Sequence, residues 1–471
     1  MPHNYDYDAL IIGSGPGGYV AAIRAAQLGQ KVAVVEKGAL GGVCLNIGCI
    51  PTKSIIHQAE IFRGRSKLTA MGVAVDDSGF KYENVFNVSR RTADGLSKGV
   101  AYLLKKNNVE VIIGAARLVS SHEVAVDGAD GSRTVTARAV IAATGSRPRI
   151  IPGLEFDGKR ILSSDDALML KELPRRALIV GSGAIGVEFA HIMNAFGVEV
   201  HLVEMMERIL PLDDGEVTAL LTRLFTKRGI KVYTSAKISS HKINGESIDA
   251  VIDGAGGNMT ALSVDKIFVM AGRTPNTDSV GFENLGIDTS ASNGFIETGD
   301  YYQTAVKSVY AIGDIIASSP LLAHAASAEG EIAAEHIAGH KPRAARVDIM
   351  SIPGVVYCEP QTASFGLTEE QAVSQNVPFV KAAFPYRGCG KAVATDAADG
   401  MVKLLASPST KKILGAHIIG SNASELIHEL LLARNAGITP AQIATMIHAH
   451  PTLSETIMEA ARAIEGWAVH A

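Results

Sequence analysis

Residues 9–18 read Ala9-Leu10-Ile11-Ile12-Gly13-Ser14-Gly15-Pro16-Gly17-Gly18, and residues 177–186 read Ala177-Leu178-Ile179-Val180-Gly181-Ser182-Gly183-Ala184-Ile185-Gly186. In both stretches an apolar run typical of a buried strand leads into a Gly-x-Gly-x-x-Gly turn and then into a helix-forming segment. A second apolar run then ends in a glutamate, Glu36 or Glu204, which follows the last glycine by 18 residues in each copy (36 − 18 and 204 − 186). The chain therefore contains the same local plan twice.

The repeated plan is typical of dinucleotide binding. A Gly-x-Gly-x-x-Gly turn lets backbone N–H groups at a helix start approach a pyrophosphate, and the glutamate accepts hydrogen bonds from a ribose diol. Because strand, helix and acid are in register twice, two tight packing turns without a ligand are a poor alternative. The pattern predicts two bound dinucleotides, although a turn alone does not say which one each copy holds. It also predicts strands and helices at residues 9–12, 19–28, 31–36, 177–180, 187–196 and 199–204.

Length and composition narrow the class of protein. The 471 residues are enough for roughly three domains. Lysine and arginine number 44 against 48 aspartates and glutamates, so the net charge of −4 gives no broad attraction to nucleic acid or anionic membranes. No stretch approaches the roughly 18 uninterrupted apolar residues of a membrane span. We expect a cytoplasmic protein, in which four cysteines are not a secretory disulfide framework.

The remaining patterns suggest where the domains end. Short β-rich runs at residues 100–127 and 133–144 precede Pro152-Gly153, and a second turn-rich stretch covers residues 272–276. Beyond residue 347, strand-like segments come before helical ones, which indicates an α+β domain. We predict an α/β protein with two Rossmann-like dinucleotide-binding domains, at residues 1–150 and 151–275, a central segment at 276–346 and an α+β dimerisation domain at 347–471.

Cys44 and Cys49 lie in the glycine-containing segment after Glu36. Five residues apart in a regular helix, they would be too distant for a disulfide, whose Cα atoms are about 4.4–6.8 Å apart. We therefore expect irregular backbone here. Pro51 suits the first turn of a helix and places Cys49 just before the helix N-terminus, where the helix dipole stabilises a thiolate. Since two cysteines are too few for a zinc site, the pattern favours a reactive dithiol.

A histidine near the C-terminus has the setting of a general acid/base. His450 precedes Pro451, which holds it off helical backbone, and Glu455 is close enough in sequence to orient its ring. The His-x-His spacing with His448 could instead indicate metal ligands, but no acid or thiol cluster completes such a site. We predict no metal site, and a packing or surface role for His448.

With these motifs the chain resembles, essentially from end to end, the flavoprotein pyridine nucleotide-disulfide oxidoreductases. It is most similar to the members that oxidise protein-bound dihydrolipoamide to lipoamide. The resemblance implies FAD on the first glycine-rich unit and NAD on the second. It implies that Cys44 exchanges with substrate, that Cys49 touches the flavin, and that His450, oriented by Glu455, moves the proton of the substrate thiol. It also implies a homodimer that serves lipoyl-bearing proteins of 2-oxo acid dehydrogenase or glycine cleavage complexes.

The same resemblance assigns the cofactor-binding residues. For FAD they are Gly13, Gly15, Gly18, Glu36, Thr144, Gly145, Asp314, Leu321, Leu322, Ala323 and His324, with Lys53 and Glu188 as an ion pair beside flavin N5. For NAD they are Gly181, Gly183, Gly186 and Glu204, and we add Gly272 and Arg273 at the second turn-rich stretch to the cofactor-binding set. The family often has methionine where Leu321 stands.

Three alternatives remain on the same scaffold. A mercuric-type reductase ends in a vicinal cysteine pair, which residues 466–471 lack. A glutathione-type reductase uses NADP, whose 2′-phosphate Glu204 would repel. A redox-inactive flavin-carrying scaffold has no use for two cysteines together with His450 and Glu455. The docking surface is not a short motif, so the sequence does not predict which lipoyl complex is served.

Overall fold

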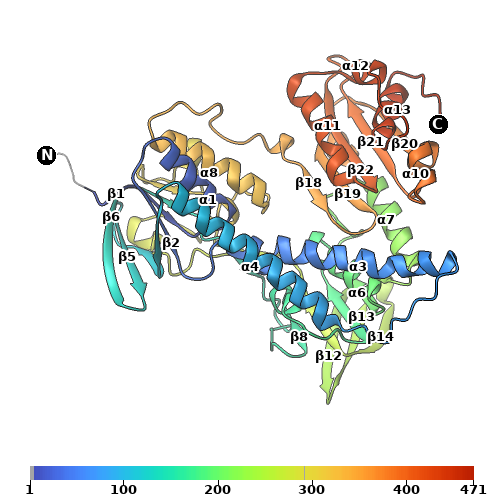
Figure 1. Ribbon diagram of the computed structural model, residues 1–471, viewed down its shortest axis with the longest axis horizontal. Helices are drawn as coiled ribbons and strands as arrows, with labels where there is room; N and C mark the ends of the chain where they lie inside the picture. The colour runs from blue at the N-terminus through green and yellow to red at the C-terminus, as the bar shows by residue number, and fades with distance from the viewer. Residues whose placement is uncertain (1–4, 291, 471) are drawn as a thin grey trace. The chain divides into compact units, whose positions relative to one another are not determined.

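The computed structural model describes residues 5–290 and 292–470. The chain forms two compact units (Figure 1). The first consists of Met1–Ile55, Glu83–Arg149 and Arg273–Val347, and the second of Ile56–Tyr82, Ile150–Gly272 and Asp348–Ala471. Each unit contains one of the two glycine-rich turns.

The first unit is built on a seven-stranded sheet with the order β3-β2-β1-β6-β5-β4, to which β17 adds beside β6. The central strand β1 is almost entirely buried, as expected for a continuous apolar run in a parallel sheet covered on both faces. The strands are β1 (Tyr7–Ile12), β2 (Val32–Glu36), β3 (Glu110–Ile113), β4 (Ala115–Leu118), β5 (Glu123–Gly128), β6 (Gly131–Ala142) and β17 (Val309–Ala311). A short pair, β7 (Ser146–Pro148) with β16 (Arg273–Pro275), joins distant parts of the chain.

The first unit also contains helices. They are α1 (Pro16–Gln27), α2 (Gly42–Ile47), α8 (Ala323–Ile337), most of α4 (Tyr82–Lys106) and the first turns of α3 (Cys49–Ala70). Helices α1 and α8 lie side by side (Figure 1). Their contact needs glycine, because a Cβ on Gly330 would lie 2.6 Å from the Gly17 carbonyl oxygen. This close packing ties a late helix of the chain to the helix that follows the first glycine-rich turn.

The second unit contains a parallel sheet with the order β11-β10-β9-β15-β8 and an antiparallel three-stranded sheet, β12-β13-β14. Its strands are β8 (Ile161–Leu162), β9 (Arg176–Val180), β10 (Glu199–Val203), β11 (Lys231–Tyr233), β12 (Lys237–Asn244), β13 (Ser247–Asp253), β14 (Met259–Val264) and β15 (Lys266–Val269). The accompanying helices are α5 (Ser164–Leu168), α6 (Ala184–Ala195) and α7 (Gly215–Lys227).

The C-terminal part of the second unit is an antiparallel sheet, β18-β19-β22-β21-β20, packed against helices (Figure 1). The strands are β18 (Gly354–Val356), β19 (Gln361–Gly366), β20 (Val380–Pro385), β21 (Met401–Ala406) and β22 (Ile413–Gly420). The helices are α9 (Glu369–Ser374), α10 (Gly390–Ala394), α11 (Ala423–Ala436), α12 (Pro440–Thr445) and α13 (Glu455–Ile464). A single apolar core joins this sheet to α11, α12 and α13.

The predicted α/β class with an α+β C-terminal part is confirmed. The prediction for residues 100–106 was wrong: they are the end of helix α4, whose Val100 and Leu104 are buried in the core of the sheet, and the β-rich region begins at Glu110. Helix α1 begins at Pro16, three residues before the predicted start. The four-part division of the chain stays a prediction. Among the described residues, no helix is both long and apolar enough to cross a bilayer.

Candidate active site

The first glycine-rich turn lies between β1 and α1. A Cβ on Gly13, whose φ is +98°, would lie 2.5 Å from the Ala143 carbonyl oxygen, and one on Gly18 would lie 2.0 Å from the Gly13 carbonyl oxygen. Both positions therefore require glycine. At Gly15, the residue that caps α1, a Cβ would meet nothing within 4 Å. The helix N-terminus thus has open space in front of it, which fits the approach of a phosphate group.

The second turn, between β9 and α6, has the same geometry. A Cβ on Gly181 would lie 2.7 Å from the Met270 carbonyl oxygen, and one on Gly186 would lie 1.9 Å from the Gly181 carbonyl oxygen. At Gly183, the N-cap of α6, nothing lies within 4 Å. The two turns therefore share the same structure: the first and third glycines are tightly packed, and the second faces open space.

The two glutamates are held in the same way. Glu36 Oε2 accepts hydrogen bonds from the backbone N–H and the hydroxyl of Ser14, at 2.9 and 2.7 Å. Glu204 Oε2 accepts the same two bonds from Ser182, at 2.8 and 2.9 Å. Each carboxylate is thereby anchored beside its turn. This placement fits the binding of a ribose diol in both units.

The segment that leads into Cys44 packs directly against the first turn. Gly41 N–H donates to the Ser14 carbonyl oxygen at 3.1 Å, and a Cβ on Gly42 would lie 2.7 Å from Gly15 Cα. Cys44 follows in α2, and Cys49 is the first residue of α3. The expectation of irregular backbone was wrong for Cys44, which is helical. The break lies at Gly48, where a Cβ would be 2.8 Å from the Val43 carbonyl oxygen.

Cys44 and Cys49 are free cysteines in the structure, and their side chains are hydrogen-bonded. The hydrogen bond from the Cys44 thiol to Cys49 raises the pKa of Cys44, and burial raises it further, while the Lys53 ammonium opposes the shift. This hydrogen bond and burial therefore both favour the thiol form of Cys44. The position of Cys49 at the start of a 22-residue helix favours negative charge on its sulfur.

A second group of predicted residues meets in the first unit where β7 pairs with β16. Thr144 and Asn276 exchange hydrogen bonds of 2.6 and 3.0 Å, and Gly145 has a φ of +70°. The Ser146 hydroxyl donates to Asp314 at 2.5 Å and accepts from Arg273 at 2.6 Å. Residues 144–146 are therefore joined to Arg273 and Asp314, far along the chain.

Helix α8 begins nine residues after Asp314, at Ala323. Leu321 has a φ of +58°, Leu322 is the N-cap, and Ala323 and His324 are the first helical residues. The predicted helix start is confirmed. Gly272, with a φ of +95°, ends the middle stretch of the second unit.

Lys53 and Glu188 belong to different units. Lys53 lies on α3 in the first unit. Glu188 lies on α6 in the second, is only 4% exposed and accepts a hydrogen bond from the backbone N–H of Tyr357 at 3.0 Å. Their pairing stays a prediction.

His450 and Glu455 are paired as the sequence predicts. His450 Nδ1 lies 2.9 Å from Glu455 Oε1, and the histidine side chain is 76% exposed. Burial alone would raise the pKa of Glu455, but hydrogen bonds from the Thr452 N–H and the His450 ring outweigh it and lower that pKa. The ring is therefore oriented by an ionised carboxylate, which leaves Nε2 for proton transfer. His448, by contrast, is a packing residue, 3% exposed and bonded to Glu429 at 2.9 Å.

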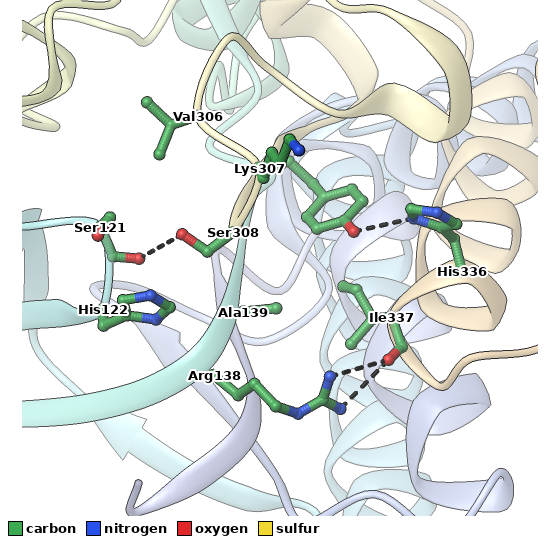
Figure 2. Close-up of a pocket in the computed structure, with 10 residues that line it drawn as sticks. Ser121, His122, Arg138, Ala139, Val306, Lys307, Ser308, His336 and Ile337 are labelled. Carbon is green, nitrogen blue, oxygen red and sulfur yellow. Dashed lines mark hydrogen bonds between the residues drawn. The ribbon is translucent and has the colours of Figure 1, made fainter. Parts of the chain in front are cut away.

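A separate hollow of about 400 Å³ lies in the first unit, and no predicted site residue lines it. Figure 2 shows the residues around it. Arg138 donates to the Ile337 carbonyl oxygen at 3.2 Å (Figure 2). The Tyr310 hydroxyl is hydrogen-bonded to His336 Nδ1 at 2.9 Å. These groups fasten the C-terminal end of α8 to the sheet. The polar atoms named here are therefore already hydrogen-bonded within the protein.

Sequence reasoning missed several residues of the site. Ser14 and Ser182 hold the two glutamates, and their repetition after the first glycine of each turn was a readable signal. Glu329 is buried and accepts a 2.7 Å hydrogen bond from the Gly313 N–H, next to Asp314. Asn276 holds Thr144. No local pattern indicates Glu329 or Asn276, because their partners are brought to them by the fold.

The turns, the anchored glutamates and the dithiol define a flavin- and nicotinamide-dependent disulfide oxidoreductase. Residues 7–330 match the family model described as pyridine nucleotide-disulphide oxidoreductase, and residues 352–461 match the dimerisation domain of the same family. The chain belongs to this family, and FAD and NAD are its cofactors.

Among the relatives are dihydrolipoyl dehydrogenases. The protein of that name from Chlorobaculum tepidum is 44% identical over 456 residues, covering 97% of this chain and 96% of the relative. One from Bacillus subtilis is 41% identical over 475 residues, covering 99% of this chain and 99% of the relative. The crystal structure of LpdA from Mycobacterium tuberculosis is similar, with a TM-score of 0.89 and 26% identity, covering 97% of this chain and 99% of that one.

Proposed function

We propose that the chain catalyses the dihydrolipoamide dehydrogenase reaction: it oxidises protein-bound dihydrolipoamide to lipoamide and reduces NAD⁺. The observation that carries the proposal is the contact of the Cys44–Cys49 segment with the first glycine-rich turn, through Gly41, Gly42 and Ser14. A cysteine pair placed against a dinucleotide turn fits electron transfer from a dithiol substrate to a bound flavin. The relatives' shared name supports dihydrolipoamide as the substrate.

We assign FAD to the first turn. Gly13, Gly15 and Gly18 would hold its pyrophosphate and Glu36 its ribose, while Thr144, Gly145, Arg273, Asp314 and residues 321–324 complete the site, with Lys53 and Glu188 at the flavin ring. NAD belongs to the second turn, on Gly181, Gly183, Gly186, Glu204 and Gly272. When bound, FAD would accept the electron pair of the dithiol and pass it as hydride to NAD⁺.

The chain's own residues perform the thiol chemistry. His450 Nε2 takes the proton of one substrate thiol, while Glu455 holds the ring through Nδ1. The substrate thiolate attacks Cys44 Sγ of the disulfide form, and the Cys44–Cys49 bond breaks with the electron pair leaving on Cys49. The second substrate thiol then attacks the substrate sulfur of the mixed disulfide, and its proton passes to Cys44 Sγ, which leaves as the thiol, while Cys49 keeps the thiolate and His450 the first proton. The substrate loses two electrons, and the cysteine pair gains them.

We further propose a homodimer in which His450 of one subunit serves the dithiol of the other. The match of residues 352–461 to a dimerisation domain supports the dimer. Exposure of His450 on a part of the chain assigned to that domain supports a role at the interface. The partners would be the lipoyl-bearing proteins of 2-oxo acid dehydrogenase or glycine cleavage complexes, in the cytoplasm. We also keep the four-part division predicted from the sequence, in which residues 347–471 form the dimerisation domain.

Parallel assays of the purified, FAD-loaded protein test the substrate. NADH oxidation is followed with lipoamide, glutathione disulfide and Hg²⁺ as acceptors at equal concentration. We expect rapid turnover with lipoamide alone. Preference for glutathione disulfide or Hg²⁺ would identify one of the other members of the scaffold, and no turnover with any acceptor would identify a redox-inactive flavoprotein.

A further inference from the structure

The loop that carries His450 is held together by Thr452. The Thr452 hydroxyl donates to the Ala449 carbonyl oxygen at 2.7 Å, which closes the chain on the N-terminal side of His450. The Thr452 N–H donates to Glu455 Oε2 at 2.9 Å, while Oε1 of the same carboxylate bonds His450. Thr452 thus bonds both the backbone just before His450 and the carboxylate that holds the His450 ring.

The third polar group of Thr452 is also engaged. Its carbonyl oxygen lies 3.3 Å from Cys389 Sγ, the donor in that contact. Cys389 is buried in the core of the C-terminal part and is the residue before α10, with its own N–H bonded to the Tyr386 carbonyl oxygen. The Thr452 carbonyl is therefore attached to a buried residue of the core. Gly390, the next residue, is so close to the ring that a Cβ there would lie 4.0 Å from His450 Cε1.

Within residues 5–290 and 292–470, the bond to Glu455 is the one hydrogen bond that holds the His450 ring. His450 is largely exposed, so packing alone does not orient its ring. Ser454, the N-cap of α13, makes no side-chain capping bond, and Glu455 is the first helical residue. The direction of the Glu455 carboxylate therefore depends on its two hydrogen bonds. If the Thr452 N–H moves, the carboxylate loses the bond that aims its other oxygen at His450.

We propose that Thr452 is a positioning residue of the acid/base pair: its hydroxyl, amide and carbonyl hold His450 and Glu455 in the geometry that transfers the substrate proton. The inference rests on the function proposed above. It predicts that the Thr452 hydroxyl affects proton transfer and leaves substrate binding and the rest of the electron path unchanged.

The test compares Thr452→Val, which removes the hydroxyl at almost constant volume, with Thr452→Ser, which keeps it. The matched control is Thr445→Val, because Thr445 is exposed and its hydroxyl makes the same kind of bond, to Ala441 O, within α12. Each FAD-loaded dimer is assayed with NADH for lipoamide reduction and for ferricyanide reduction. Ferricyanide accepts electrons one at a time and presents no thiol to a general acid or base.

Loss of one neutral hydrogen bond corresponds to a factor of about 2 to 10. We expect Thr452→Val to lower kcat for lipoamide by about that factor, with unchanged KM for lipoamide and an unchanged ferricyanide rate. Thr452→Ser and Thr445→Val should match the wild type in both assays. Wild-type kcat in Thr452→Val, or equal losses with both acceptors, would overturn the proposal. If the wild type reduces ferricyanide but not lipoamide, the proposed function is wrong and the role of Thr452 falls with it.

Discussion

Replacing Glu329 by glutamine should stabilise the protein at neutral and alkaline pH but not at acid pH. Glu329 is 3% exposed on α8, and its Oε2 accepts a hydrogen bond from the Gly313 N–H. Burial raises the pKa of this carboxyl to about 7, and the charge of Asp314 adds to the rise, although the Gly313 bond and Arg346 oppose it. A glutamine oxygen can accept the same bond, so Glu329→Gln removes the ionisation and keeps the contact.

The expected change in the free energy of unfolding follows from the pKa of Glu329 in the unfolded and in the folded chain. In the unfolded chain the carboxyl has its ordinary pKa of 4.5, so the rise to about 7 is roughly 2.5 units. At 1.36 kcal/mol per unit this is about 3 kcal/mol. Because the folded-state pKa is raised, the wild type has the full contribution below pH 4.5 and loses it as the pH rises through 7. Glu329→Gln should equal the wild type near pH 4.5 and exceed it by about 3 kcal/mol at pH 8.

The assay is urea denaturation of the FAD-loaded wild type and Glu329→Gln at pH values from 4.5 to 8, followed by circular dichroism. Glu331→Gln is the matched control, since Glu331 lies two residues along the same helix and is exposed. The difference between Glu329→Gln and the wild type should grow with pH, while that of Glu331→Gln stays constant. A Glu329→Gln difference that is the same at pH 4.5 and pH 8 would refute the reasoning.

The remaining predictions concern cofactor choice and the roles of the catalytic groups. The kcat/KM for NAD should exceed that for NADP, because the Glu204 carboxylate, held by Ser182 and the Met206 N–H, would repel a 2′-phosphate; a preference for NADP contradicts this. Reduction by NADH or dihydrolipoamide should produce a long-wavelength absorbance from a Cys49 thiolate facing the flavin, retained as a constant band in Cys44→Ser and lost in Cys49→Ser; identical spectra for the two variants would mean that the roles are misassigned. Cys49→Ser and His450→Ala homodimers should each be nearly inactive with lipoamide, since loss of a general base costs about 10²–10⁴-fold. If His450 serves the other subunit, refolding the two variants together should restore about a quarter of full activity, because half the dimers then have one intact site of two; activity no higher than the separately refolded controls, with mixed dimers confirmed by mass, rules out the shared site.

Much of the candidate site was predictable because its determinants are local. The glycines at 13, 18, 181 and 186 are required by contacts within a few residues or with the neighbouring strand. The His450–Glu455 pair spans five residues, and Pro451 and the start of α13 bring its members together. Helix α4 was partly misread because Val100 and Leu104, which face the sheet, belong to a short stretch that also suits a strand.

The sequence by itself determined the two dinucleotide turns, their terminal glutamates, the dithiol and the acid/base pair, since each is encoded by residues close together in the chain. Only the tertiary structure decided four hydrogen-bonded pairs that are distant in sequence. They are Asn276 with Thr144, Glu329 with Gly313, Glu188 with Tyr357, and Cys389 with Thr452. These contacts depend on which helices and strands pack together, and packing is decided by burial of whole apolar faces. A polar side chain in such a contact has no local pattern, because its partner is chosen by the fold.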